Sequence, residues 1–200
     1  MELSSIAGLL EGQPMFKLLA LAKEMEAKGE AGIHFEIGDP SFHSPKPAVK
    51  AVRNALDEGR THYTDSFGDA EFREQIRLYT ERHWGFKPSL SQILVCPANT
   101  LIDFSLRCIA NPLDEVILQD PCFPTYNSVM KYTGITPVYV ALKPEWGFRI
   151  QSKDIENAIT ERTKAILINS PHNPTGAVLR KKDVMQIAEL ARERGIFLIS

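Results

Sequence analysis

Lys164-Ala165-Ile166-Leu167-Ile168 runs directly into Asn169-Ser170-Pro171-His172-Asn173-Pro174-Thr175-Gly176. The first five residues are mostly apolar, as in a parallel strand that is buried on both faces. An amphipathic helix is predicted after the loop, over residues 181–194. The polar loop is therefore expected at the carboxyl end of a sheet strand, where open α/β sheets bind their ligands.

The prolines and the glycine restrict the shape of this loop. Ser170 and Asn173 each precede a proline, which disfavours helical backbone at both positions. Gly176 can adopt backbone angles that other residues rarely reach. The pattern predicts that the Asn173 amide is held at a fixed angle over the sheet edge. A plain turn closed by an Asx-type hydrogen bond is the alternative.

The rest of the chain predicts an α/β fold. Three helices are expected before residue 92, over residues 13–28, 45–58 and 68–84. After residue 92 short apolar runs alternate with amphipathic segments, which predicts a mostly parallel sheet with helices on both faces, a three-layer α/β/α arrangement. The expected strands are 93–96, 116–118, 137–142, 166–168 and 196–199, and the expected helices between them are 101–110, 125–133, 153–159 and 181–194.

The strand followed by Asn-Pro-Thr-Gly resembles the class I/II aminotransferases, which are fold-type I enzymes that depend on pyridoxal 5'-phosphate (PLP). The resemblance implies that Asn173 donates a hydrogen bond to the phenolic oxygen of the cofactor. It implies a phosphate site at Ala98, Asn99 and Thr100, where a helix is predicted to begin and free backbone N–H groups attract anions. A capped helix without a ligand is the alternative there.

Three further positions match the family in order along the chain. Phe123, in Asp120-Pro121-Cys122-Phe123-Pro124, stands where the family stacks an aromatic ring on the cofactor, although a core position would also suit it. Tyr63 stands where a tyrosine reaches the cofactor phosphate of the neighbouring subunit, and a half-buried aromatic is the alternative. Gly38, in Gly38-Asp39-Pro40, matches a turn beside the substrate carboxylate, and a common turn is the alternative.

The resemblance also predicts a domain division and missing parts. Residues 1–45 are expected to form an amino-terminal segment of the small domain, and residues 46–200 a truncated PLP-binding large domain. In the family, the aspartate that contacts the pyridine nitrogen and the lysine that forms the Schiff base come later than the position of Ser200. We therefore expect the amino-terminal part of a longer enzyme, without a catalytic residue of its own and inactive alone.

Composition excludes several other classes of protein. The net charge of −2 gives no sign of a nucleic-acid or anionic membrane surface. No apolar run approaches the roughly 18 residues of a membrane span, and the first sixteen residues contain no Lys or Arg, so no signal peptide is expected. Three widely spaced cysteines favour a reducing cytoplasm, and the five histidines show no metal-binding spacing.

The resulting prediction is an aminotransferase of amino-acid metabolism. It would move an amino group between an amino acid and a 2-oxo acid, with PLP as cofactor and a homodimer as the full-length assembly. A fold-type I PLP lyase of the carbon–sulfur β-lyase type shares most of these motifs, and a non-catalytic degenerate fragment is a further alternative. A nucleotide-binding domain is disfavoured, because neither phosphate-binding glycine motif is present.

Overall fold

The structure is a computed structural model that describes residues 2–9 and 13–200, with no description of the Leu9 side chain. It divides into two compact units, Met1–Pro14 with Asn99–Ser200, and Met15–Ala98. None of the helices within the described ranges is both long and apolar enough to cross a membrane.

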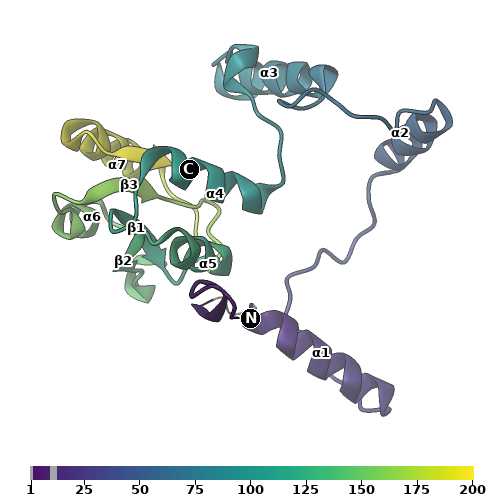
Figure 1. Cartoon of the computed structure of the whole chain (residues 1–200), viewed down its shortest axis with the longest axis horizontal. Helices are drawn as coiled ribbons and strands as arrows, with labels where there is room; N and C mark the ends of the chain where they lie inside the picture. Colours follow the sequence, from purple (N-terminus) through teal and green to yellow (C-terminus); the bar gives the residue numbers. More distant parts are fainter. Residues whose placement is uncertain (1, 10–12) are drawn as a thin grey trace. The chain divides into compact units, whose positions relative to one another are not determined.

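The first unit contains a four-stranded sheet with the order β2-β1-β3-β4, in which every neighbouring pair is parallel. Strands β1, β2 and β3 are labelled in Figure 1. The strands are β1 (Glu115–Asp120), β2 (Thr136–Ala141), β3 (Thr163–Leu167) and β4 (Phe197–Ile199). The helices of this unit are α4 (Ala98–Ile109), α5 (Pro124–Thr133), α6 (Ser152–Ala158) and α7 (Lys181–Arg194), with short 3-10 turns at Ala7–Leu9 and Pro144–Trp146. The predicted α/β fold with a parallel sheet is confirmed.

The two inner strands, β1 and β3, contribute buried side chains to cores on both faces of the sheet. On one face Val116 and Leu118 of β1 pack with Leu106 of α4 and Met130 of α5. On the other face Ile117 packs in a cluster that includes Ile155 of α6 and Ile187 of α7. Alternate side chains of β1 therefore enter two different cores, which explains why this strand is apolar throughout its middle.

The helices begin and end at residues suited to those positions. The Asp69 carboxylate accepts a hydrogen bond from the Phe72 backbone N–H at 2.9 Å and caps α3 (Ala70–Trp84). Pro124 occupies the first turn of α5. Gly134 ends α5 and Gly195 ends α7, both with positive φ.

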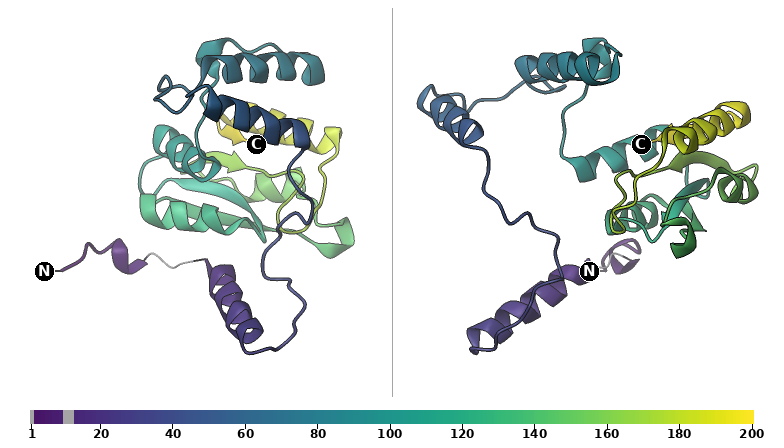
Figure 2. Two further views of the ribbon diagram at one scale, coloured as in Figure 1. Left: turned by 90° about the vertical axis from the view of Figure 1, so that its right-hand side faces the viewer. Right: turned by 180° about the vertical axis from the view of Figure 1, so that it is seen from behind.

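The second unit contains α1 (Pro14–Ala27), α2 (Lys46–Asp57), α3 (Ala70–Trp84) and a 3-10 turn at Leu90–Gln92. Figure 2 shows these helices joined by segments without regular structure. Within this unit, Arg73 of α3 donates from Nε to the Ile93 carbonyl at 3.1 Å, and its guanidinium lies 5.2 Å from the centre of the Phe67 ring.

The predicted strand at residues 93–96 is wrong. Ile93 has extended backbone angles, but no described residue before β1 is in a strand. The Val95 N–H donates to the Phe67 carbonyl at 2.9 Å, so a loop occupies the place of a neighbouring strand. An extended segment becomes a strand only where a second strand completes the ladder, and an apolar run cannot show whether one is present.

Candidate functional site

The first unit contains the switch point of an open parallel sheet. The chain passes from β1 through α5 to β2 on one side, and then through α6 to β3 on the other side of β1. The loops that follow β1 and β3 therefore leave neighbouring strands at the carboxyl edge. Because α5 and α7 pack on opposite faces of the sheet, these loops diverge, as at the ligand-binding crevice of such sheets.

The loop after β3 is fixed by hydrogen bonds within itself. The Asn169 side-chain oxygen accepts from the Asn173 backbone N–H at 2.7 Å, and the Gly176 N–H donates to the His172 carbonyl at 2.6 Å. The Ser170 hydroxyl accepts from the Leu179 N–H at 3.0 Å. Gly176 has a φ of 71°, which a side chain would strain. The loop is thus closed on itself, with Asn173 exposed to solvent.

A buried glutamine of β1 lies beneath this loop. Gln119 is 3% exposed, and its Oε1 accepts the Asn169 backbone N–H at 2.6 Å. Its Nε2 is buried without a hydrogen-bond partner among the residues that the structure describes. Asn169 is therefore fixed by its backbone to the central strand and by its side chain to Asn173.

His172 is the buried member of the loop. Its Nδ1 lies 2.8 Å from the Thr175 hydroxyl oxygen. Burial lowers the pKa of the His172 ring, and a hydrogen bond to the Pro121 backbone offsets part of that effect. The ring is accordingly neutral near pH 7.

The loop after β1 carries Phe123, which is half-buried just before α5. Its ring packs edge-to-face on Tyr126, with centroids 5.7 Å apart and planes at 73°. The neighbouring Cys122 thiol lies 3.6 Å from the Asn127 side-chain oxygen. Burial, and then the charge of Asp120, raise the pKa of Cys122, so this group is a thiol and not a thiolate nucleophile at neutral pH.

The first turn of α4 contains Ala98, Asn99 and Thr100, of which the first two are exposed. The Asn99 side-chain oxygen accepts a hydrogen bond of 3.4 Å from the Thr125 hydroxyl in the first turn of α5. Thr125 in turn accepts from Gln13 Nε2 at 3.0 Å. The starts of two helices and the amino-terminal segment of the first unit are therefore connected.

Gly38 and Tyr63 belong to the second unit, and Tyr63 is exposed. Their predicted contacts with the residues of the first unit stay predictions. Phe123, Asn173, Asn99 and Thr100 belong to one compact unit. Ala98 lies at the boundary, as the first residue of α4 and the last of the second unit.

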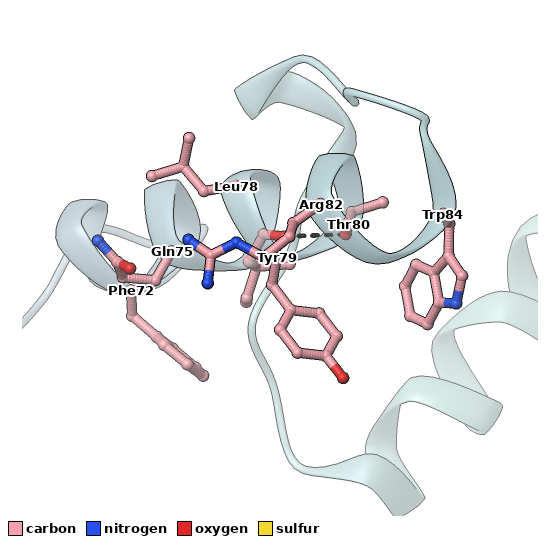
Figure 3. A pocket seen from close by; sticks show the side chains of 8 residues that line it. Phe72, Gln75, Leu78, Tyr79, Thr80, Arg82 and Trp84 are labelled. Atoms are coloured by element: carbon pink, nitrogen blue, oxygen red, sulfur yellow. Dashed lines mark hydrogen bonds between the residues drawn. The ribbon is translucent and has the colours of Figure 1, made fainter.

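A separate hollow lies against α3 in the second unit (Figure 3). Its lining is mostly apolar and aromatic, and the Thr80 hydroxyl in it donates to the Ile76 carbonyl at 2.8 Å. None of the predicted cofactor-binding residues lines it. The lining residues are Phe72, Gln75, Ile76, Leu78, Tyr79, Thr80, Arg82 and Trp84.

Comparison with known proteins identifies the family. The family model described as Aminotransferase class I and II matches residues 30–200. The chain belongs to this family. In class I and II aminotransferases as a group, PLP is the usual cofactor, and this chain has the α/β architecture of its structural neighbours.

Individual relatives agree with this assignment. A protein named "Probable aspartate/prephenate aminotransferase" from Aquifex aeolicus is 41% identical, over 99% of this chain and 50% of the relative. "(5-formylfuran-3-yl)methyl phosphate transaminase" from Methanocaldococcus jannaschii is 38% identical, over 95% of this chain and 48% of the relative. The structure of an aspartate aminotransferase from Thermus thermophilus with maleate matches with a TM-score of 0.94 and 31% identity, over 99% of this chain and 52% of that one. The chain spans about half the length of these aminotransferases.

No role was predicted from the sequence for Gln119, Asn169, Thr125 or Gln13. Gln119 stands in an apolar run just before Asp120-Pro121, where a polar residue is typical of the exposed end of a strand. The one feature of the sequence that could have indicated Gln119 is its uncharged polar side chain directly after the apolar run Val116-Ile117-Leu118. Its partner, Asn169, is 50 residues later in the chain, and only the strand register brings the two together.

Proposed function

We propose that this aminotransferase chain provides the PLP-binding site of an enzyme that transfers amino groups between an amino acid and a 2-oxo acid. The observation that carries the proposal is the position of Asn173 and Phe123 in the loops that follow β3 and β1, on both sides of the switch point. Ligands of open α/β sheets bind at this point.

The donor set suits PLP. An exposed amide at Asn173 matches the phenolic oxygen, and the half-buried Phe123 ring offers an apolar face for a flat heterocycle. The first turn of α4, at Ala98, Asn99 and Thr100, offers backbone N–H groups that an α-helix leaves unpaired at its start, which suits a phosphate. Hydrogen bonding, stacking and anion binding are thus available from a single compact unit, apart from Ala98 at its boundary.

Each residue has a proposed task. Asn173 donates to the phenolic oxygen and sets the rotation of the ring, and Phe123 excludes water from one ring face. The first turn of α4 holds the phosphate, with the Tyr63 hydroxyl from a second subunit as an additional donor. Gly38 lies beside the substrate carboxylate. When bound, PLP supplies an electron-accepting ring that stabilises negative charge at the substrate α-carbon.

We also propose the coarse organisation that goes with this role. Residues 1–45 belong to the small domain and residues 46–200 to the PLP-binding domain. The working enzyme is a cytoplasmic homodimer. The family relatives carry the names of different amino-group transfers, so the proposal covers the class of substrate and not one donor.

A cofactor-binding experiment tests the proposed PLP-binding site. The purified 200-residue chain is titrated with PLP and followed by absorption and equilibrium dialysis. We expect saturable binding that Asn173→Ala weakens roughly three- to tenfold, the value of one lost hydrogen bond. Asn157→Ala, which removes an exposed asparagine of α6, is the matched control and should not change the affinity. Equal affinities for all three proteins would contradict the proposed role of Asn173.

Borohydride reduction tests which groups of this chain react. Lys164 lies on β3, and Lys181 and Lys182 begin α7. We expect none of them to be labelled in preference to the other exposed lysines when the chain is reduced with PLP present, and we expect no turnover by the 200-residue chain. Selective labelling of one of these three lysines would contradict this assignment. If turnover does occur, release of pyruvate and ammonia would indicate a lyase, and amino-group exchange an aminotransferase.

A further inference from the structure

The central strand contains a polar side chain where packing alone favours an apolar one. β1 lies between β2 and β3, and its residues Val116, Ile117 and Leu118 are fully buried. Gln119 is the next residue and is 3% exposed, with Nε2 unpaired among the described residues. A buried amide donor without a partner costs free energy that a leucine of similar size would avoid. The hydrogen bond that Gln119 Oε1 accepts therefore offers the reason for a glutamine at this position.

Gln119 Oε1 adds one hydrogen bond to the ladder between β1 and β3. The last paired residues in the register of these strands are Leu118 and Leu167. The Ile168 N–H donates to the Ile199 carbonyl at 2.9 Å, so it is directed toward β4. Successive N–H groups along an extended chain point to opposite sides, which directs the Asn169 N–H toward β1. The Gln119 side chain accepts it at 2.6 Å.

The same bond fixes the residue that holds Asn173. Asn169 Oδ1 accepts the Asn173 N–H at 2.7 Å, so two hydrogen bonds in series connect the central strand with Asn173. The His172 carbonyl, which accepts the Gly176 N–H, belongs to the same peptide group as the Asn173 N–H, so these two bonds are coupled. The Leu179 N–H donates instead to the Ser170 hydroxyl, through a separate peptide group. Loss of the Gln119 oxygen would thus release Asn173 and leave Leu179 held.

We propose that Gln119 is a positioning residue for Asn173, acting through the backbone and side chain of Asn169. It sets where the Asn173 amide lies at the carboxyl edge of the sheet. Its effect on a ligand rests on the proposed function, because that effect passes through the hydrogen bond from Asn173 to the phenolic oxygen of PLP. Its effect on the loop itself does not depend on PLP.

Amide hydrogen exchange of the 200-residue chain, resolved by residue, tests the connection without a cofactor. In Gln119→Leu we expect exchange at Asn173 to rise about tenfold, while exchange at Leu179, whose N–H donates to the Ser170 hydroxyl, stays unchanged. Gln119→Glu retains an acceptor oxygen and should restore most of the protection. Ile117→Val, a change in the same strand away from the loop, should leave the ratio of the two rates unchanged. Unchanged exchange at Asn173, or an equal rise at both amides, would overturn the proposal; Gln119→Met replaces the leucine variant if that one does not fold.

Cofactor affinity then tests the consequence. In Gln119→Leu we expect the dissociation constant for PLP to rise roughly three- to tenfold, with no change for a PLP analogue that lacks the phenolic oxygen. Added to Asn173→Ala, the leucine should cause no further loss, because both changes remove one interaction. An equal loss for the analogue, or an additive loss in the double variant, would overturn the positioning role. If the unaltered chain does not bind PLP, the proposed function fails and the effect on ligand fails with it, whereas the exchange result still decides the link from Gln119 to Asn173.

Discussion

The two ends of β1 bury polar side chains in opposite ways. At the amino end Glu115 is 3% exposed, and its carboxylate accepts from the Thr160 hydroxyl at 2.5 Å and from Arg162 Nε at 3.0 Å. At the carboxyl end Gln119 is equally buried, but among the residues that the structure describes only its oxygen has a partner. One end is satisfied by the turn that leads into β3, and the other end connects to the loop that contains Asn173.

This difference suggests separate roles for the two ends of β1: the contacts of Glu115 stabilise the fold, and the contact of Gln119 holds a loop. A buried charge contributes to folding only when its partners are complete, as they are at Glu115. An incompletely paired amide contributes less to folding, so the presence of Gln119 is better explained by the loop that it holds. Ligand sites of open parallel sheets lie at the carboxyl edge, which is the Gln119 end of β1.

The largest effect is expected at the amino end. Glu115→Ala removes a buried acceptor and leaves the Thr160 hydroxyl without its partner, so we expect the free energy of unfolding to fall by about 2–3 kcal/mol. Urea denaturation measures this loss of unfolding free energy. The PLP affinity, measured under conditions in which the variant is folded, should stay unchanged. A stability loss below about 0.5 kcal/mol, the range of ordinary surface substitutions, would remove the contrast between the two ends.

An intermediate effect is expected from pH. The Thr160 hydroxyl, and then Arg162, lower the pKa of Glu115 from its ordinary value. The folded state therefore favours the carboxylate, and this contribution is complete above the ordinary pKa of about 4.3 and is lost as pH falls through the lower, folded-state value. We expect the native chain to be about 1–2 kcal/mol more stable than Glu115→Gln near pH 6, with the difference shrinking below about pH 4. A difference that is constant with pH would contradict the role of the charge.

The smallest effect is expected from His172, in the loop after β3 at the carboxyl edge of the sheet. Because burial lowers the pKa of this ring, the folded state favours its neutral form, and stability is lost as pH falls below the ordinary value of about 6.5. Between about pH 7.5 and 5.5 the unfolding free energy of the native chain should fall measurably, by up to about 1 kcal/mol, relative to His172→Gln. If the urea midpoints of the two proteins changed with pH in parallel over this range, burial would not shift the pKa of the His172 ring.

The sequence predicted the elements that depend on local pattern. The apolar runs that became β1, β2, β3 and β4 are short, continuous and separated by helices, so they predict a parallel sheet without knowledge of contacts. The strand at residues 93–96 was wrong because strands need neighbours, and here the Phe67 carbonyl takes the Val95 N–H instead.

The predicted site is only partly visible in the sequence. Asn173 and Phe123 could be singled out by motif, and their roles stay predictions. The connection from Gln119 through Asn169 to Asn173 depends on strand register and on distances across 50 residues of chain. A polar residue near the end of an apolar run gives no indication of which distant N–H group it meets.

The two outer strands of the sheet differ in how open they are to further pairing. Along β2, Pro137 has no backbone N–H, which interrupts the donors on that strand. β4 contains no proline, pairs with β3 alone within the described residues, and leaves Phe197 58% exposed. The free side of β4 is thus a template for an additional strand, whether from the same polypeptide or from another molecule.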